Sequence, residues 1–166
     1  MNGNDEVERL ERNLERQLHW IAAADGKAGF GFAFATAMLG VLAATVPKNP
    51  AEWGIGPAIA AAFAMVLAII ALVLLSLATL PRVTGPKRSL IFWGGIAQFT
   101  VDQFKNAVSE TTDAEYIADL AGQCHRNAEI ASTKFALIRL ASLCIYGAVL
   151  PWVAAVWLLY SRARAT

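Results

Sequence analysis

The sequence contains few of the residues on which most enzymes and metal proteins depend. It has two histidines and two cysteines among 166 residues, and only 16% of its residues are charged. His19 and His125 each stand alone, without the neighbours of a catalytic set or a metal cluster. Cys124 lies in a polar segment and Cys144 in an apolar one, so we expect no disulfide between them. These absences predict a protein that is not an enzyme and that has no catalytic residues, no metal and no cofactor.

An excess of charge of one sign is also lacking. The 14 basic and 13 acidic residues leave a formal net charge of +1. Nucleic-acid-binding domains usually carry a clustered basic surface that attracts phosphate groups. The balance of charge therefore predicts no nucleic-acid partner.

Apolar residues are abundant, at 57% of the sequence. They gather in three runs without Asp, Glu, Lys or Arg, at residues 28–46, 57–80 and 140–160. About 20 apolar residues in a helix cross a hydrocarbon core of roughly 30 Å. The second run is apolar on every face, which is typical of a helix surrounded by lipid. The three runs predict three transmembrane helices and membrane lipid as a partner.

The predicted fold is an all-α membrane protein with a cytoplasmic helical insertion between the second and third spans. Thr112 and Glu115 form a capping-box pattern that starts a long helix, and no breaker separates this helix from the third span. The expected organisation is an amphipathic N-terminal helix (1–27), a first span (28–46), an outer loop (47–56), a second span (57–80), a cytoplasmic helical region (81–134), a third span (135–160) and a short outer tail (161–166).

Basic residues set the expected orientation. Four lie in residues 1–27 and seven in residues 81–139, so that eleven of the 14 fall on one side if all three spans cross. Segments rich in Lys and Arg usually stay in the cytoplasm. We therefore predict a multi-pass protein whose N-terminus is cytoplasmic.

The N-terminal helix has one apolar stripe. Val7, Leu10, Leu14, Leu18 and Ile21 recur every three or four residues. The stripe predicts either a helix that lies on the membrane or on the protein's own cytoplasmic part, or a helix that pairs between subunits.

Asp25 and Lys27 stand at the start of the first span, where charged groups are costly unless they are paired or hydrated. They do not face each other, because residues two apart on a helix point in different directions. We predict that Asp25 pairs with a cation at the same depth, which is Lys134, Arg139 or Arg82. A structural ion pair and a gating role for Asp25, Lys27 and Arg139 both remain open.

Small residues mark one face of the first span. Gly29, Ala33 and Ala37 recur every four residues, and such residues let two helices approach closely. The partner is either the chain's own spans or another copy of the chain. Because three helices bury little interior, we expect a homo-oligomer.

The segment after the second span combines cations with glycines. Arg82, Lys87 and Arg88 form a basic elbow that suits phospholipid headgroups or a phosphorylated ligand. Gly94 and Gly95 follow an apolar patch, and paired glycines allow unusual backbone angles or the close approach of another group.

The order of four short motifs resembles the transmembrane effectors of bacterial Pycsar anti-phage systems. These motifs are AAADGKAG at 22–29, LIFWGGI at 90–96, YIADLAGQ at 116–123 and STKFALIRL at 132–140. The resemblance covers nearly the whole chain, and no β-rich cyclic-nucleotide-binding module accompanies it. It implies an effector in the bacterial inner membrane. A partner cyclase makes a cyclic pyrimidine nucleotide, cCMP or cUMP, which activates the effector to impair the membrane and cause abortive infection.

If this chain senses such a nucleotide, its cytoplasmic helices must bind it. From their chemistry, the candidate phosphate partners are Lys87, Arg88, Arg126 and Lys134. The candidate stacking groups are Phe92 and Trp93. The alternative function is a structural or scaffolding oligomeric membrane protein without a small-molecule ligand.

Overall fold

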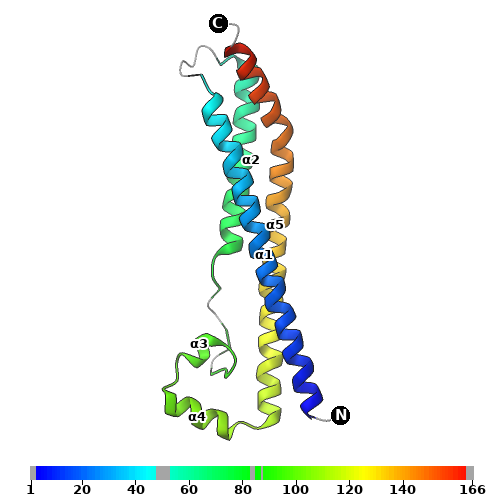
Figure 1. Ribbon diagram of the computed structural model, residues 1–166, viewed down its shortest axis with the longest axis vertical. Helices are drawn as coiled ribbons and strands as arrows, with labels where there is room; N and C mark the ends of the chain where they lie inside the picture. The colour runs from blue at the N-terminus through cyan, green and yellow to red at the C-terminus, as the bar shows by residue number, and fades with distance from the viewer. Residues whose placement is uncertain (1–2, 48–52, 83–84, 87, 164–166) are drawn as a thin grey trace. The chain divides into compact units, whose positions relative to one another are not determined.

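The computed structural model describes residues 3–47, 53–82, 85–86 and 88–163, and every regular element in these ranges is a helix (Figure 1). The helices are α1 (Gly3–Thr45), α2 (Ile55–Thr79), α3 (Trp93–Ile96), α4 (Val101–Glu110) and α5 (Asp113–Ala163). Within the described residues, α1, α2 and α5 are long and apolar enough to cross a membrane. The prediction of an all-α membrane protein with three spans is confirmed.

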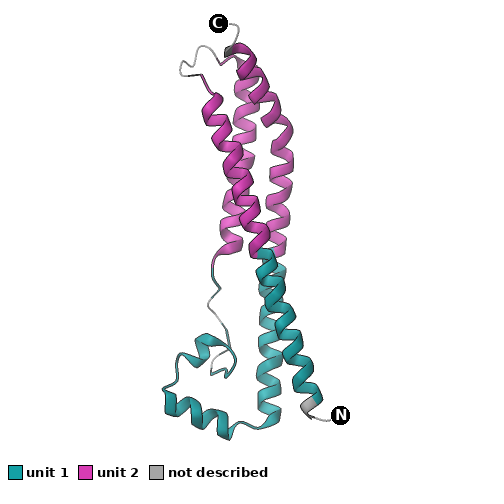
Figure 2. Ribbon diagram, in the orientation of Figure 1, with its two compact units in different colours: residues 1–24, 81–134 teal, residues 25–80, 135–166 magenta. Residues whose placement is uncertain are grey.

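The chain forms two compact units, which Figure 2 distinguishes by colour. Unit 1 contains residues 1–24 and 81–134, and unit 2 contains residues 25–80 and 135–166. The long helices α1 and α5 each contribute to both units. The short helices α3 and α4 belong to unit 1, and α2 belongs to unit 2.

The core of unit 2 is a seam of small side chains. Buried residues of α2 recur at alternating intervals of three and four: Pro57, Ala61, Ala64, Ala68, Ala71, Leu75 and Ala78. This interval keeps one side of a helix against its neighbours, as in a coiled coil. Because most of the buried residues are alanine, the helix backbones approach closely, as membrane helices commonly do.

Contacts in unit 2 bring α1, α2 and α5 together. A Cβ atom on Gly31 of α1 would lie 3.0 Å from Cδ1 of Leu75 in α2 and 3.8 Å from Cδ1 of Ile145 in α5. The indole N–H of Trp152 in α5 donates a 2.9 Å hydrogen bond to the carbonyl oxygen of Met38 in α1. One cluster of the core consists of Leu42, Ala61, Ala64 and Ala155.

The small-residue face of the first span does not pack inside the chain. Gly29, Ala33 and Ala37 are exposed, whereas Ala28 and Ala35 of the same helix are fully buried. Of the two partners expected for this face, the chain's own spans are therefore excluded by the structure. Contact with another copy of the chain stays a prediction.

One end of unit 2 joins the connector between α1 and α2 to the end of α5. Arg162 Nη1 donates a 3.1 Å hydrogen bond to the carbonyl oxygen of Trp53, and Trp53 Nε1 donates a 3.0 Å bond to the carbonyl oxygen of Pro47. Gly54 has a φ of 65°, and the Arg162 guanidinium occupies the space that a Cβ atom would need. The described ends of the predicted outer loop and the C-terminal end of α5 therefore share one end of the unit.

In unit 1, α1 lies beside α5. The Cys124 thiol donates to the carbonyl oxygen of Leu10 at 3.5 Å, and the Tyr116 hydroxyl donates to Glu11 Oε1 at 3.4 Å. The predicted cap of α5 is present, because Glu115 Oε2 accepts from the Thr112 N–H at 2.9 Å and from its hydroxyl at 2.8 Å. From this cap α5 continues without interruption to Ala163, and the prediction of one long helix is confirmed.

Candidate functional site

The segment before α3 is organised around a buried serine. Ser89 Oγ accepts hydrogen bonds from the backbone N–H groups of Ile91 at 3.1 Å and Phe92 at 2.8 Å. Gly95 packs against the backbone of Ser89, where a Cβ atom would lie 2.8 Å from the carbonyl oxygen. Gly95 thus allows the close backbone approach expected from paired glycines.

Phe92 is the apolar centre of the same segment. Its side chain is buried, and a Cβ atom on either Gly85 or Gly94 would lie 2.6 Å from its ring. The ring centroid of Trp93 is 5.4 Å away, in a tilted arrangement. The pattern Phe-Trp-Gly-Gly therefore builds a compact turn around an aromatic ring.

A hydrogen bond joins this segment to α5. The backbone N–H of Leu90 donates to Asp119 Oδ2 at 2.8 Å. Beside this bond lies an open cavity of about 1060 Å³, which residues of unit 1 line. Ligand pockets usually have volumes of about 300–1,000 Å³. The lining residues are Arg88, Ser89, Leu90, Gly95, Gln98, Phe99, Gln103, Asn106, Ala107, Glu110, Thr111, Glu115, Tyr116 and Asp119. We call this the unit 1 cavity.

The unit 1 cavity carries more acidic than basic groups. Three carboxylates line it, those of Glu110, Glu115 and Asp119, and Arg88 is the one cation among its described lining residues. Hydrogen bonds from the backbone and side chain of Thr112 hold the pKa of the Glu115 carboxyl below its usual range. Arg88 has a φ of 58°, a left-handed backbone conformation that is uncommon for residues other than glycine.

The partly buried phenol of Tyr116 also lines the cavity. Burial is the main cause that raises the pKa of this phenol, and the negative charge of Glu11 adds to it. Tyr116 therefore keeps its proton at neutral pH and remains available as a hydrogen-bond donor.

The predicted ligand residues near the elbow differ in their surroundings. Arg88 lines the unit 1 cavity. Phe92 is buried in the glycine turn, and Trp93 is 63% exposed without lining the cavity. Lys87 lies outside the described residues. Of these four residues, the structure places Arg88 in a cavity wall.

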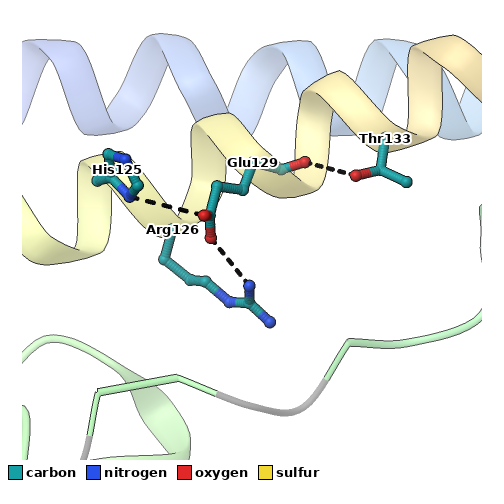
Figure 3. Close-up of polar contacts among 4 residues, drawn as sticks. All are labelled: His125, Arg126, Glu129 and Thr133. Atoms are coloured by element: carbon teal, nitrogen blue, oxygen red, sulfur yellow. Dashed lines mark hydrogen bonds and ion pairs between the residues drawn. The ribbon is translucent and has the colours of Figure 1, made fainter.

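The other two predicted phosphate partners lie further along α5. Arg126 Nη1 forms a 3.0 Å ion pair with Glu129 Oε2, and His125 Nδ1 lies 4.0 Å from Glu129 Oε1 (Figure 3). The Thr133 hydroxyl donates to the carbonyl oxygen of Glu129 at 2.9 Å. Lys134 is buried, with 7% of its surface exposed. Neither Arg126 nor Lys134 lines the unit 1 cavity.

The predicted ion-pair residues belong to unit 2. Lys27 Nζ lies 5.1 Å from the ring centroid of Phe135, which is within the range of a cation–π contact. Asp25 and Arg139 are both exposed. The ion pair of Asp25 with a neighbouring cation stays a prediction.

Unit 1 also contains a buried polar seam that the sequence pattern did not indicate. Gln17 of α1 and Gln123 and Asn127 of α5 are more than nine-tenths buried. Each has a buried polar atom without a hydrogen-bond partner among the described residues: Gln17 Oε1, Gln123 Oε1 and Asn127 Nδ2. Gln17 follows Leu10 and Leu14 at the spacing of the apolar stripe. This spacing continues the buried side of the helix onto a polar residue, and it is the sequence signal that could have indicated the burial of Gln17.

Comparison with known proteins agrees with this architecture. No curated protein and no solved structure matches the chain. A family model described as the Pycsar effector protein domain matches residues 9–161, which is nearly the whole chain. The chain therefore belongs to the Pycsar effector family, whose members are transmembrane, non-enzymatic effectors of cyclic-nucleotide anti-phage defence.

Proposed function

We propose that a cyclic pyrimidine nucleotide, cCMP or cUMP, activates this effector to impair the bacterial inner membrane. The nucleotide comes from a partner cyclase during phage infection, and loss of membrane integrity stops growth before phage release. The observation that carries the proposal is the position of Glu115, Tyr116 and Asp119. All three line the unit 1 cavity and belong to α5, the helix that continues into the third apolar run.

This continuity supports a mechanism by population shift. A ligand in the unit 1 cavity contacts both the segment at Arg88–Leu90 and the start of α5. If one arrangement of these elements binds the ligand better, binding moves the equilibrium toward that arrangement. A change from 1:99 to 99:1 needs an affinity ratio on the order of 10⁴. Because α5 is one helix from Asp113 to Ala163, a rotation or tilt at its start alters its packing among the spans.

The proposal includes an orientation and an assembly. Residues 81–134 face the cytoplasm as a helical region, together with the N-terminus, because a cytoplasmic cyclase releases its product there. The excess of basic residues in these segments supports this orientation. The exposed small-residue face of Gly29, Ala33 and Ala37 supports a homo-oligomer, since such a face packs closely against another helix.

Purified protein in liposomes tests the proposed function. The liposomes hold a potassium gradient and a voltage-sensitive dye, and cCMP, cUMP or cAMP is added outside. We expect at least one cyclic pyrimidine nucleotide to collapse the potential, while cAMP leaves it unchanged. Protein-free liposomes are the control for the dye. An intact potential with both pyrimidine nucleotides, together with no binding heat in calorimetry, would contradict the proposal.

A further inference from the structure

We propose that the N-terminal part of α1 is a strap that opens from α5 in unit 1, and that the closed strap restrains the effector. The strap consists of residues 3–24, which are the described part of α1 that belongs to unit 1. Its opening is a property of the helix pair itself, whereas its restraining role rests on the proposed function. Unpaired buried amides, shallow apolar burial and long hydrogen bonds all favour the opening.

The polar seam lies between the strap and α5. Gln17 is two turns of helix from Leu10, so both residues lie on the same side of the strap. The carbonyl oxygen of Leu10 accepts a hydrogen bond from Cys124 of α5. Asn127 follows Cys124 by three residues, and residues three apart are neighbours on one helix face. The amides of the seam therefore belong to the facing sides of the two helices.

These amides destabilise the closed arrangement. Gln17 Oε1, Gln123 Oε1 and Asn127 Nδ2 are buried without a hydrogen-bond partner among the described residues. A polar atom that loses its water on burial and gains no partner raises the free energy of the buried state. When the strap opens, water supplies the missing hydrogen bonds. The seam therefore favours opening of the strap.

The polar seam contrasts with the packing of the same helix in unit 2. All the buried polar or charged side chains of the described residues belong to unit 1; they are Gln17, Ser89, Gln123, Asn127 and Lys134. The buried side chains of α1 in unit 2 are apolar; they are Ala28, Ala35, Met38 and Leu42. Apolar packing thus holds α1 in unit 2, where no described amide opposes it.

The strap buries little apolar surface. Among residues 5–24, the buried side chains are those of Gln17 and Ala24. Leu10, Leu14 and Ile21 of the apolar stripe are only half-buried. Because hydrophobic stabilisation grows with the apolar area removed from water, these side chains hold the strap weakly.

The hydrogen bonds between the strap and α5 are long. The Tyr116 hydroxyl lies 3.4 Å from Glu11 Oε1, and the Cys124 thiol lies 3.5 Å from the Leu10 carbonyl oxygen. Hydroxyl-to-oxygen bonds in proteins are usually about 2.7–2.8 Å. These two contacts therefore add little resistance to opening.

Glycine marks the place where α1 leaves the strap. Gly26 and Gly29 follow the strap within the continuous helix α1, and a Cβ atom at either position would meet nothing within 4 Å. Packing within the described residues does not require glycine there, and glycine is the weakest helix former apart from proline. The helix is therefore easiest to bend at the end of the strap.

Cys124 provides a native probe of the opening. Its side chain is buried beneath the strap, and burial raises the pKa of the thiol, so it reacts slowly while the strap is closed. When opening and closing are faster than the reaction, the rate of thiol labelling follows the population of the open state. Cys144→Ala leaves Cys124 as the sole cysteine of the full-length protein. Mass spectrometry of this protein in detergent measures the labelling rate.

A triple variant, Gln17→Met/Gln123→Met/Asn127→Leu, tests the role of the amides. The new side chains have similar shapes and no polar group to desolvate. Removing a buried unpaired polar group shifts a two-state equilibrium by roughly 5- to 150-fold. We expect the triple variant to be labelled at Cys124 at least about 5-fold more slowly than the parent.

Two single variants accompany it. Gly26→Ala should also slow the labelling, because alanine stiffens the helix where the strap bends. Asn106→Leu is the control and should leave the rate unchanged, because this side chain is exposed on α4. Far-ultraviolet circular dichroism verifies that all variants keep their helices.

Liposomes test the restraining role. If the open strap belongs to the active arrangement, a variant that favours the closed strap needs more ligand to reach it. The triple variant should therefore need at least about 5-fold more cCMP or cUMP for half-maximal collapse of the membrane potential. A seam that only stabilises the fold would change the labelling rate without changing this concentration.

The outcomes separate the opening, the restraint and the proposed function. Equal labelling of the parent and the triple variant overturns the opening. A labelling rate that depends on urea as steeply as global unfolding does also overturns it, because a local opening exposes less surface. Slower labelling with an unchanged half-maximal nucleotide concentration overturns the restraint. If the parent responds to neither nucleotide, the proposed function and the restraint fail, and the labelling rates still decide whether the strap opens.

Discussion

The backbone N–H of Leu90 donates a 2.8 Å hydrogen bond to the carboxylate of Asp119, 29 positions along the chain. The bond fastens the segment before α3 to the beginning of α5. Ser89, which precedes Leu90, accepts two backbone hydrogen bonds at its Oγ from the turn around Phe92. The bond therefore links the turn around Phe92 to α5, the helix that continues into the third apolar run.

Replacing Asp119 with Ala should release the turn from α5. A hydrogen bond to a charged group contributes about 1.5–3 kcal/mol, and the loss also leaves the Leu90 N–H without its acceptor. We expect faster amide hydrogen exchange at residues 89–92, measured by mass spectrometry on the protein in detergent. Asp102→Ala, which removes an exposed acidic residue of α4, should leave this exchange unchanged. Equal exchange in the parent and in Asp119→Ala would mean that the bond does not hold the turn.

Replacing Asn127 with Leu should stabilise unit 1. The buried Nδ2 of Asn127 has no partner in the described part of the chain, and a buried unsatisfied group costs about 1–3 kcal/mol. Leucine has a similar shape and fits the apolar spacing of α5. We expect a higher midpoint of thermal unfolding by circular dichroism, and no such gain for Asn106→Leu, whose side chain is exposed. A lower midpoint for Asn127→Leu would show that the amide has a partner in solution.

Replacing Gly54 with Ala should destabilise the end of unit 2 at which Arg162 contacts the connector. Gly54 has a φ of 65° and a ψ of 148°, a region that few residues other than glycine adopt, so that a residue with a Cβ atom is destabilised by about 1–3 kcal/mol there. The new methyl group also displaces the Arg162 guanidinium. We expect a lower thermal midpoint in detergent. Gly56→Ala is the matched control, because a Cβ atom there meets nothing within 4 Å and alanine favours a helix. Similar midpoints for Gly54→Ala and Gly56→Ala would show that the backbone conformation at Gly54 does not require glycine.

The cap of α5 should weaken in acid. The backbone and side-chain hydrogen bonds of Thr112 favour the ionised carboxylate and so lower the pKa of Glu115 below its usual range. A group with a lowered pKa in the folded state stabilises it above the unfolded pKa, and this contribution disappears as the pH falls through the folded pKa. We therefore expect the midpoint temperature of unfolding, measured from pH 7 to pH 3, to decrease once the pH is below about 4.5.

Glu115→Gln separates this effect from other acidic groups. Glutamine retains the capping geometry but does not titrate, so the variant should lose part of the pH dependence below about pH 4.5. Parallel pH profiles for the parent and the variant would show that the Glu115 carboxylate does not contribute to stability in acid.

The sequence by itself determined the spans and the start of α5. Charge-free runs long enough to cross a bilayer are local features, because burial of charge in lipid is costly wherever the helix lies. The Thr112–Glu115 cap is local as well, since both partners lie within one turn. The continuity of α5 from this cap followed from the absence of a breaker between the cap and the third span. These predictions needed no knowledge of which helix packs against which.

Only the tertiary structure decided which faces are buried and which residues line the cavity. The small-residue face at Gly29 and Ala33 is exposed, while Ala28 and Ala35 of the same helix are buried. Composition alone does not distinguish these faces, because both carry small residues. The unit 1 cavity likewise collects side chains from the segment before α3, from α4 and from α5, and their positions depend on contacts between residues distant in sequence. Periodicity along one helix contains no information about such contacts.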